Sequence, residues 1–125
     1  MSDVDEELCK EVMAPDETIR FAAIVNNLGK IVASEYRKGQ IPLLTREESE
    51  LSAAQSILRM GLRKALESKL GKTVYAFAMY EKIKRAAIPL AGNFIFMVSF
   101  DLQSEHEPII LQKIVPLLKR QGLVS

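Results

Sequence analysis

The sequence predicts an α+β fold in which helices pack against a five-stranded, mainly antiparallel sheet. Two apolar stretches flank the turn sequence Asn-Asn-Leu-Gly at residues 26–29, a pattern that predicts a β-hairpin. A long amphipathic segment follows, and then three strand-like stretches joined by short connections. Short connections favour antiparallel pairing, so the predicted element order is α-β-β-α-β-β-β-α.

The length of 125 residues fits one domain, and we expect residues 1–125 to form it. The net charge of +1 lacks the basic excess of proteins that bind nucleic acid non-specifically. The single cysteine, Cys9, excludes an intrachain disulfide, and we interpret it as a small buried hydrophobic residue. The acidic N-terminus differs from a secretory signal, and no apolar run spans a bilayer, so we expect a cytoplasmic protein.

Residues 3–13 predict a short helix, which Pro15 ends. Residues 18–25 and 30–36 predict the two strands of the hairpin, because both are rich in β-branched and aromatic side chains. Asparagine and glycine in the intervening turn tolerate positive φ, although the turn type stays open. Both strands are nearly uncharged, so both faces of the hairpin need to be covered.

Thr45 and Glu48 form the pattern of a capping box, which predicts the start of a long helix. We expect this helix to run to Leu70, with Gly71 as its stop. One broad apolar stripe along it is suited to packing on the sheet. The stripe consists of Leu51, Ala54, Leu58, Leu62, Ala65 and Leu66.

A second apolar set on the same helix lies away from that stripe, and small residues there permit close approach of another backbone. Either a neighbouring helix of the same chain or a second copy of the chain would cover this side, and the sequence leaves both open. We take Ala53, Ile57, Met60, Gly61 and Lys64 as the candidate dimer or partner surface.

Residues 73–80, 82–90 and 93–101 predict three further strands. Pro89 cannot donate a ladder hydrogen bond, so it is expected at a strand end or a sheet edge.

Ser104 is the expected N-cap of a final helix, with Glu107 completing a second capping box. Pro116 predicts a kink or early fraying within that helix. The apolar stripe of the helix consists of Ile110, Ile114, Leu117 and Leu118.

His106 is the only histidine, and no serine, cysteine or aspartate partner is evident for it. We interpret it as a solvated residue at the start of a helix. Zinc-ligand sets, phosphate-binding glycine loops and calcium-loop spacings are absent from the sequence. We therefore expect no enzyme activity, no cofactor and no metal.

The lysines and arginines fall into separate groups along the chain. We interpret them as a solvated face, with strand-edge lysines that discourage aggregation. A nucleic-acid surface with interleaved tyrosines is the alternative, and the near-neutral charge argues against it. The groups are Arg37 and Lys38; Arg59, Arg63, Lys64 and Lys69; and Lys82, Lys84 and Arg85.

The order of a hairpin, a long helix, three strands and a final helix resembles the roadblock/dynein-light-chain class of the profilin-like folds. Separately, "IRFAAIVNNLGKIVASEYRKGQIPLL" and "LRMGLRKALESKLG" resemble a family of small proteins of uncharacterised activity from ammonia-oxidising archaea (Thaumarchaeota). The roadblock resemblance implies dimers built through the long helix and an adjacent strand. It also implies scaffolds or regulators of small Ras-like GTPases.

Our leading hypothesis is a non-enzymatic regulatory or scaffold module that forms a homodimer through the long helix and binds a protein partner, a small GTPase by analogy of fold. The alternative is a small-molecule-sensing domain of the PAS or profilin-like kind. Its pocket would be lined by Tyr75, Phe77, Tyr80, Phe94 and Phe96.

Overall fold

The structure, a computed structural model, describes residues 3–124 and holds a five-stranded sheet within them. The strand order is β2-β1-β5-β4-β3, and every pairing is antiparallel. The predicted α+β fold is confirmed. The strands are β1 (Ile19–Val25), β2 (Ile31–Tyr36), β3 (Ala76–Met79), β4 (Lys84–Leu90) and β5 (Phe94–Phe100).

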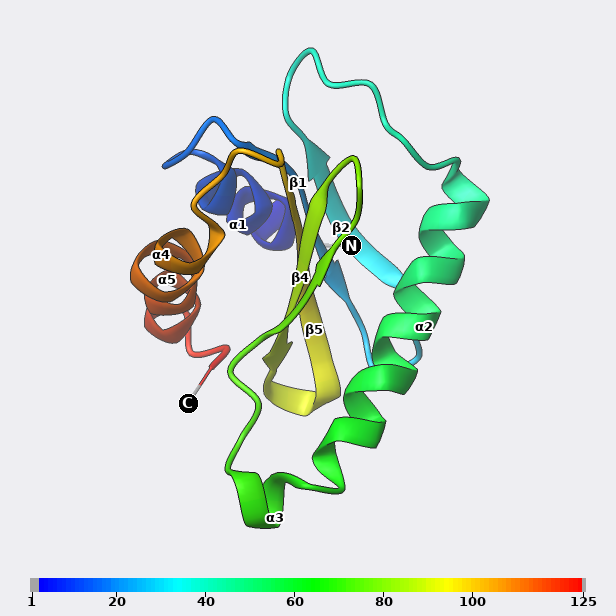
Figure 1. Cartoon of the computed structure of the whole chain (residues 1–125), viewed down its shortest axis with the longest axis vertical. Coiled ribbons are helices and arrows are strands. Elements are labelled where there is room, and N and C mark those ends of the chain that lie inside the picture. The colour runs from blue at the N-terminus through cyan, green and yellow to red at the C-terminus, as the bar shows by residue number, and fades with distance from the viewer. Residues whose placement is uncertain (1–2, 125) are drawn as a thin grey trace.

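Helices cover both faces of the sheet, as Figure 1 shows: α2 runs along one face, and α1, α4 and α5 lie on the other. The helical segments are α1 (Asp3–Met13), α2 (Arg46–Lys64), α3 (Glu67–Leu70), the 3-10 turn η1 (Ala91–Asn93), α4 (His106–Pro108), the π-helical segment η2 (Ile109–Ile114) and α5 (Val115–Arg120). None of the helices within residues 3–124 combines the length and the apolarity that crossing a membrane requires.

The sheet has a hydrophobic cluster on each face. On the first face, α1 and the C-terminal helical segments pack over the strands and bury Phe96, Phe100 and Ile110. On the second face, α2 packs through a smaller set, called here the α2 cluster. Its buried members are Ala23, Val25, Ala53, Met60, Ile95 and Met97. Helix α1 therefore covers one face of the β1–β2 hairpin, whereas on the other face α2 packs against β1 and leaves Ser34 and Tyr36 of β2 exposed.

The predicted hairpin is present, and its turn is held by Asn26. The carbonyl of Asn26 accepts a hydrogen bond from the N–H of Gly29 at 2.9 Å. Its side-chain oxygen accepts from the N–H groups of Leu28 and Lys30, each at 3.0 Å. The Asn26 side chain thus supplies an acceptor for two backbone N–H groups of the turn.

The start of α2 is confirmed and its predicted end is wrong. Glu48 N–H donates to the Thr45 hydroxyl at 3.1 Å, and Thr45 N–H donates to the Glu48 carboxylate at 2.9 Å, which completes the capping box. The helix stops at Lys64 instead of Leu70, and the short α3 follows. Residues 61–66 are exposed, so no buried contact holds the helix straight there, and α3 begins after Leu66, whose φ is −102° and ψ is −3°.

The final helix also departs from its predicted start. Its N-cap is Glu105, and the side-chain oxygen of Ser104 is buried without a hydrogen-bond partner instead of capping the helix. The helix does not fray at Pro116. A π-helical turn precedes the proline, with Val115 N–H bonding to the Ile110 carbonyl, and the helix continues to Arg120. The wider turn accommodates a residue that has no N–H to donate.

The three later strands are shorter than predicted, but their order and turns hold. Pro89 lies beyond Ala87, which is the last β4 residue that pairs with β3. The proline therefore lies near the end of its strand, as expected. No residue of β3 pairs with it, so no β3 carbonyl needs an N–H from this position.

Candidate interaction surface

The two apolar sides of α2 are reversed relative to prediction. The side that packs on the sheet carries the small residues Ser52, Ala53 and Ser56 together with Met60. The leucine stripe that was expected to face the sheet is exposed instead, with Leu58 at 70% and Leu62 at 76% of full exposure. Small side chains let the helix approach the sheet closely, and four large leucines could not be accommodated in that space.

The predicted partner surface is correspondingly split. Ala53 and Met60 are 0% and 3% exposed and lie in the α2 cluster, so neither is available to a partner of the folded chain. Ile57 is half-buried against the same cluster. Gly61 and Lys64 are exposed, and the Lys64 ammonium donates to the side-chain oxygen of Asn93. Of this predicted surface, Ala53 and Met60 thus make intrachain contacts.

The exposed side of α2 carries a set of leucines, called here the leucine face. It consists of Leu51, Leu58 and Leu62 of the helix and Leu66 just beyond its end, all exposed, with the exposed Gln55 between Leu51 and Leu58. Single exposed leucines are ordinary on a protein surface. Several exposed leucines on one side of a helix are characteristic of a surface that contacts another protein.

Charge is distributed unevenly along α2. Glu47 and Glu48 lie in its first turn, and Arg63 and Lys64 lie in its last turn. Each sign sits at the helix end whose dipole it complements. The two ends of the leucine face therefore lie next to opposite charges.

The five aromatic residues of the alternative pocket do not come together in the described part of the chain. Phe96 is fully buried in the cluster on the α1 face, and Tyr75 and Phe94 pack at the margin of that cluster. Phe77 and Tyr80 are exposed at the edge strand β3 and line a groove of about 60 Å³. That volume is far below the several hundred cubic ångströms of typical ligand pockets.

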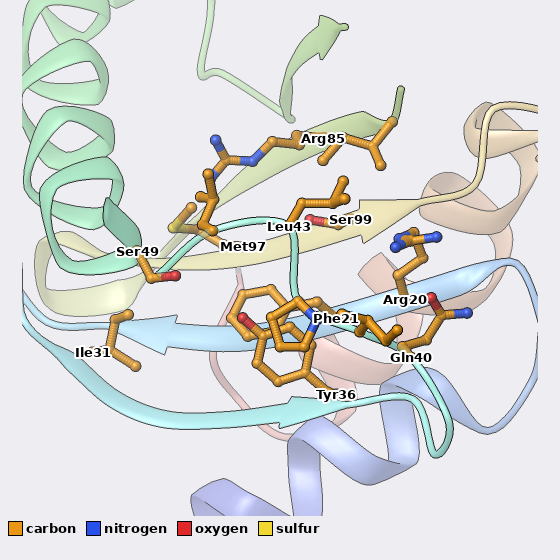
Figure 2. A pocket seen from close by; sticks show the side chains of 14 residues that line it. Arg20, Phe21, Ile31, Tyr36, Gln40, Leu43, Ser49, Arg85, Met97 and Ser99 are labelled. Atoms are coloured by element: carbon orange, nitrogen blue, oxygen red, sulfur yellow. The ribbon is translucent and has the colours of Figure 1, made fainter. Parts of the chain in front are cut away.

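A second small pocket lies under the loop of residues 37–45, which leads from β2 to α2. Figure 2 shows the rings of Phe21 and Tyr36 against one another at its centre, and their centroids are 4.5 Å apart. Leu43 comes from the covering loop, and Met97 and Ser99 come from β5. The cavity measures about 50 Å³, and a neighbouring hollow of about 420 Å³ is lined by Phe21 and Tyr36 together with Leu44 of the loop.

His106 is not solvated as predicted. Its ring stacks on Phe77 with centroids 4.0 Å apart and planes 11° apart, and its Nδ1 is buried. Burial lowers the pKa of His106, and the nearby positive charge of Lys84 lowers it further. Lys84 was expected on a solvated face, but it is buried and donates to the Ser104 carbonyl at 2.7 Å.

Cys9 is buried in α1, as interpreted from the sequence. Burial, followed by the negative charges of Asp5, Glu35 and Glu6, raises the pKa of its thiol to about 12. The sulfur is therefore protonated at neutral pH and is a poor nucleophile. Among residues 3–124, no three histidine, cysteine, aspartate or glutamate side chains gather in a way that could hold a metal ion.

The fold gathers three arginines that are far apart in the sequence. Arg59 and Arg63 of α2 and Arg85 of β4 line one groove between α2 and β3, together with Phe77 and Tyr80. We call this the arginine groove. Sequence reasoning placed these cations in separate groups, because only the pairing of β3 with β4 beside α2 brings them together.

No protein-family model matches the sequence, and the curated proteins contain no detectable relative of it. Solved structures do show similarity of fold. A roadblock/LC7 domain from Streptomyces avermitilis superposes with a TM-score of 0.73 at 10% identity and covers 97% of both chains. MglB from Myxococcus xanthus superposes with a TM-score of 0.71 at 13% identity, covering 96% of this chain and 95% of MglB. A further MglB structure, described with a tetrameric arrangement, has a TM-score of 0.71 at 16% identity and covers 96% and 85%. The chain has the roadblock/LC7 fold.

Proposed function

We propose that this chain is a non-enzymatic regulatory or scaffold module of the cytoplasm that self-associates through the leucine face of α2. The observation that carries the proposal is that α2 has two different sides. Its small residues are buried on the sheet, while its three leucines, Leu51, Leu58 and Leu62, remain exposed, as does Leu66 just beyond its end. Covering those leucines removes a large apolar area from water, which is the main driving force of protein association.

The charges of α2 support a second copy as the occupant of this face. A twofold axis near the middle of the helix would make two α2 helices antiparallel. Glu47 and Glu48 of one copy would then approach the Arg63 and Lys64 end of the other. Such opposite charges favour the antiparallel arrangement and disfavour the parallel one.

The similarity of fold supports the same proposal. One of the similar structures, MglB, is described with a tetrameric arrangement, so this fold is compatible with self-assembly. By analogy of fold, we propose a small Ras-like GTPase as the class of partner that the assembled module regulates. No residue of this chain carries that analogy, and a binding assay with candidate GTPases of the host is its test.

The proposed self-association is tested by placing charge on the leucine face. The double variant Leu58→Asp, Leu62→Asp should lower the mass measured by light scattering to that of the single chain, without lowering the thermal midpoint. Leu111→Asp is the matched control, because Leu111 is an exposed leucine of η2, on the other face of the sheet. An unchanged mass in the double variant would show that the leucine face is not the interface of the assembly.

A further inference from the structure

The hollow of about 420 Å³ beside the Phe21–Tyr36 ring pair lies on the face of the sheet that α2 covers, and it is called here the aromatic hollow. Phe21 pairs with Tyr36 across β1 and β2, so the two rings project from the same face. Figure 2 shows Ile31 and Ser49 on the side of these rings that is nearer to α2. The volume of the hollow is within the range of pockets that hold small molecules.

Small side chains leave this space open. The cross-strand pair that shares a face with Phe21 and Tyr36 is Ala23 with Ser34, and neither side chain reaches far from the sheet. Ser34 is exposed and lines the hollow from β2, and Ser49 lines it from α2. A large side chain at Ser34 would occupy the space, so the hollow depends on a small residue at this position.

The walls of the hollow are mainly apolar. Ile31 contributes from β2, and Pro42 and Leu44 contribute from the loop of residues 37–45. The same loop carries Ile41 at 81% and Leu43 at 52% of full exposure. Apolar side chains gathered in one exposed loop are characteristic of a binding surface. A molecule seated in the hollow would remove part of this apolar surface from water.

The rim of the hollow carries a cation without an acidic partner. Lys30 lies on the rim, and its ammonium makes no ion pair with another of the residues 3–124. Arg46 and Glu50, also on the rim, pair with one another at 3.6 Å. The charge that remains at the rim is therefore positive. Aromatic rings beside a positive rim suit an aromatic molecule that carries an anionic group.

We propose that the aromatic hollow binds a small, planar aromatic molecule with one anionic group. The rings of this ligand pack against Phe21 and Tyr36, and its anionic group lies toward Lys30. Leu44 of the loop contacts the bound rings. The hollow lies between β2 and α2, whereas the leucine face is the exposed side of α2, so ligand binding does not depend on self-association.

The test uses the dye anilinonaphthalene sulfonate, an aromatic anion whose fluorescence rises when it moves from water to apolar surroundings. Phenylnaphthylamine is the matched neutral dye, because it keeps the rings and lacks the sulfonate. The folded, unmodified chain should bind both dyes saturably. Added salt should weaken binding of the anionic dye and leave binding of the neutral dye unchanged, because salt screens the attraction to Lys30.

Filling the hollow tests its role as the site. Ser34→Phe places a ring in the hollow and suits a β-strand, so it should weaken binding of both dyes at least about tenfold at an unchanged thermal midpoint. Ser68→Phe, at an exposed serine of α3, is the matched control and should leave binding unchanged. Leu44→Ala alters an exposed loop residue only, and it should weaken binding of both dyes about threefold.

Reversing the charge of the rim tests recognition of the anionic group. Lys30→Glu should weaken binding of the anionic dye about fivefold and leave binding of the neutral dye unchanged. Lys82→Glu is the matched control, because Lys82 is an exposed lysine in the turn between β3 and β4. It should leave binding of both dyes unchanged.

Three outcomes would overturn the proposal. Absence of saturable dye binding to the unmodified chain would show that the hollow holds no ligand of this class. Binding that persists in Ser34→Phe and is lost in the Leu58→Asp, Leu62→Asp variant would place the dye on the leucine face. Equal losses of both dyes in Lys30→Glu would show that the anionic group is not recognised. The leucine-face variant should keep its dye binding while its mass falls, so the two proposals fail separately.

Discussion

Gly29, in the turn between β1 and β2, lies directly against Ala54 of α2. A Cβ atom on Gly29 would stand 3.0 Å from the Ala54 Cα, and Gly29 itself has a φ of +79°. The turn therefore needs glycine for its backbone conformation and for its contact with the helix. At this point α2 approaches the β1–β2 turn closely.

Gly29→Ala should destabilise the fold by about 2 kcal/mol, because it combines backbone strain with a clash against the α2 backbone. Urea unfolding followed by circular dichroism measures this loss. Gly39→Ala is the matched control, since Gly39 has a φ of +86° and open space around it. Equal losses in the two variants would show that the contact with Ala54 contributes nothing.

Met60→Ala and Leu62→Ala separate the two sides of α2. Met60 is buried in the α2 cluster, so its truncation should lower the free energy of unfolding by about 2–3 kcal/mol. Leu62 is exposed, so its truncation should change the stability of the monomer by less than about 0.5 kcal/mol. Urea unfolding at low protein concentration measures both. A larger loss of stability in Leu62→Ala than in Met60→Ala would support the helix orientation that was expected from the sequence.

Arg37 fastens the end of α1 to β1 through backbone carbonyls. Its Nε donates to the Ile19 carbonyl at 2.8 Å, and its Nη2 donates to the carbonyls of Asp16, at 2.6 Å, and Met13. Arg37→Lys should cost about 2 kcal/mol of stability, because an ammonium cannot reproduce this planar fork. Lys38→Arg, at the exposed neighbour, should have no effect in the same urea titration. Full stability of Arg37→Lys would contradict this assignment.

The stability of the fold should fall as the pH drops below 6.5. Burial holds the pKa of His106 below its usual 6.5, so the unfolded chain takes up a proton before the folded chain does. The contribution of His106 to the free energy of unfolding is therefore fully present above pH 6.5. It is lost as the pH falls from 6.5 through the lower pKa of the folded state.

His106→Phe keeps an aromatic ring over Phe77 and removes the titration. In this variant, the free energy of unfolding measured with urea should be nearly flat between about pH 7.5 and 5.5, because the chain has no other histidine. An equal decline in the variant and the unmodified chain would place the sensitivity elsewhere.

Local signals in the sequence predicted local structure well. The capping box of Thr45 and Glu48, the turn at Asn26 and the bounds of α1 depend on residues that lie close together in the chain. The end of α2 was misjudged because it depends on what the helix buries. Beyond Met60 the helix has no buried side chain.

The orientation of α2 could not be read from its own periodicity. Both sides of the helix are apolar, and the larger residues were assigned to the core. The packing partner determines the orientation: near the β1–β2 turn the close contact of Gly29 with Ala54 favours small side chains, and Met60 is buried farther along the helix. The arginine groove was missed for a related reason. Arg63 and Arg85 are neighbours only after β3 and β4 have paired beside α2.

Light scattering over a dilution series of the unmodified chain tests self-association most directly. The proposal predicts a mass of twice 14.0 kDa at high micromolar concentration, falling toward 14.0 kDa on dilution. The leucine-face variant should stay at 14.0 kDa throughout. A mass of 14.0 kDa for the unmodified chain at high micromolar concentration would contradict the account.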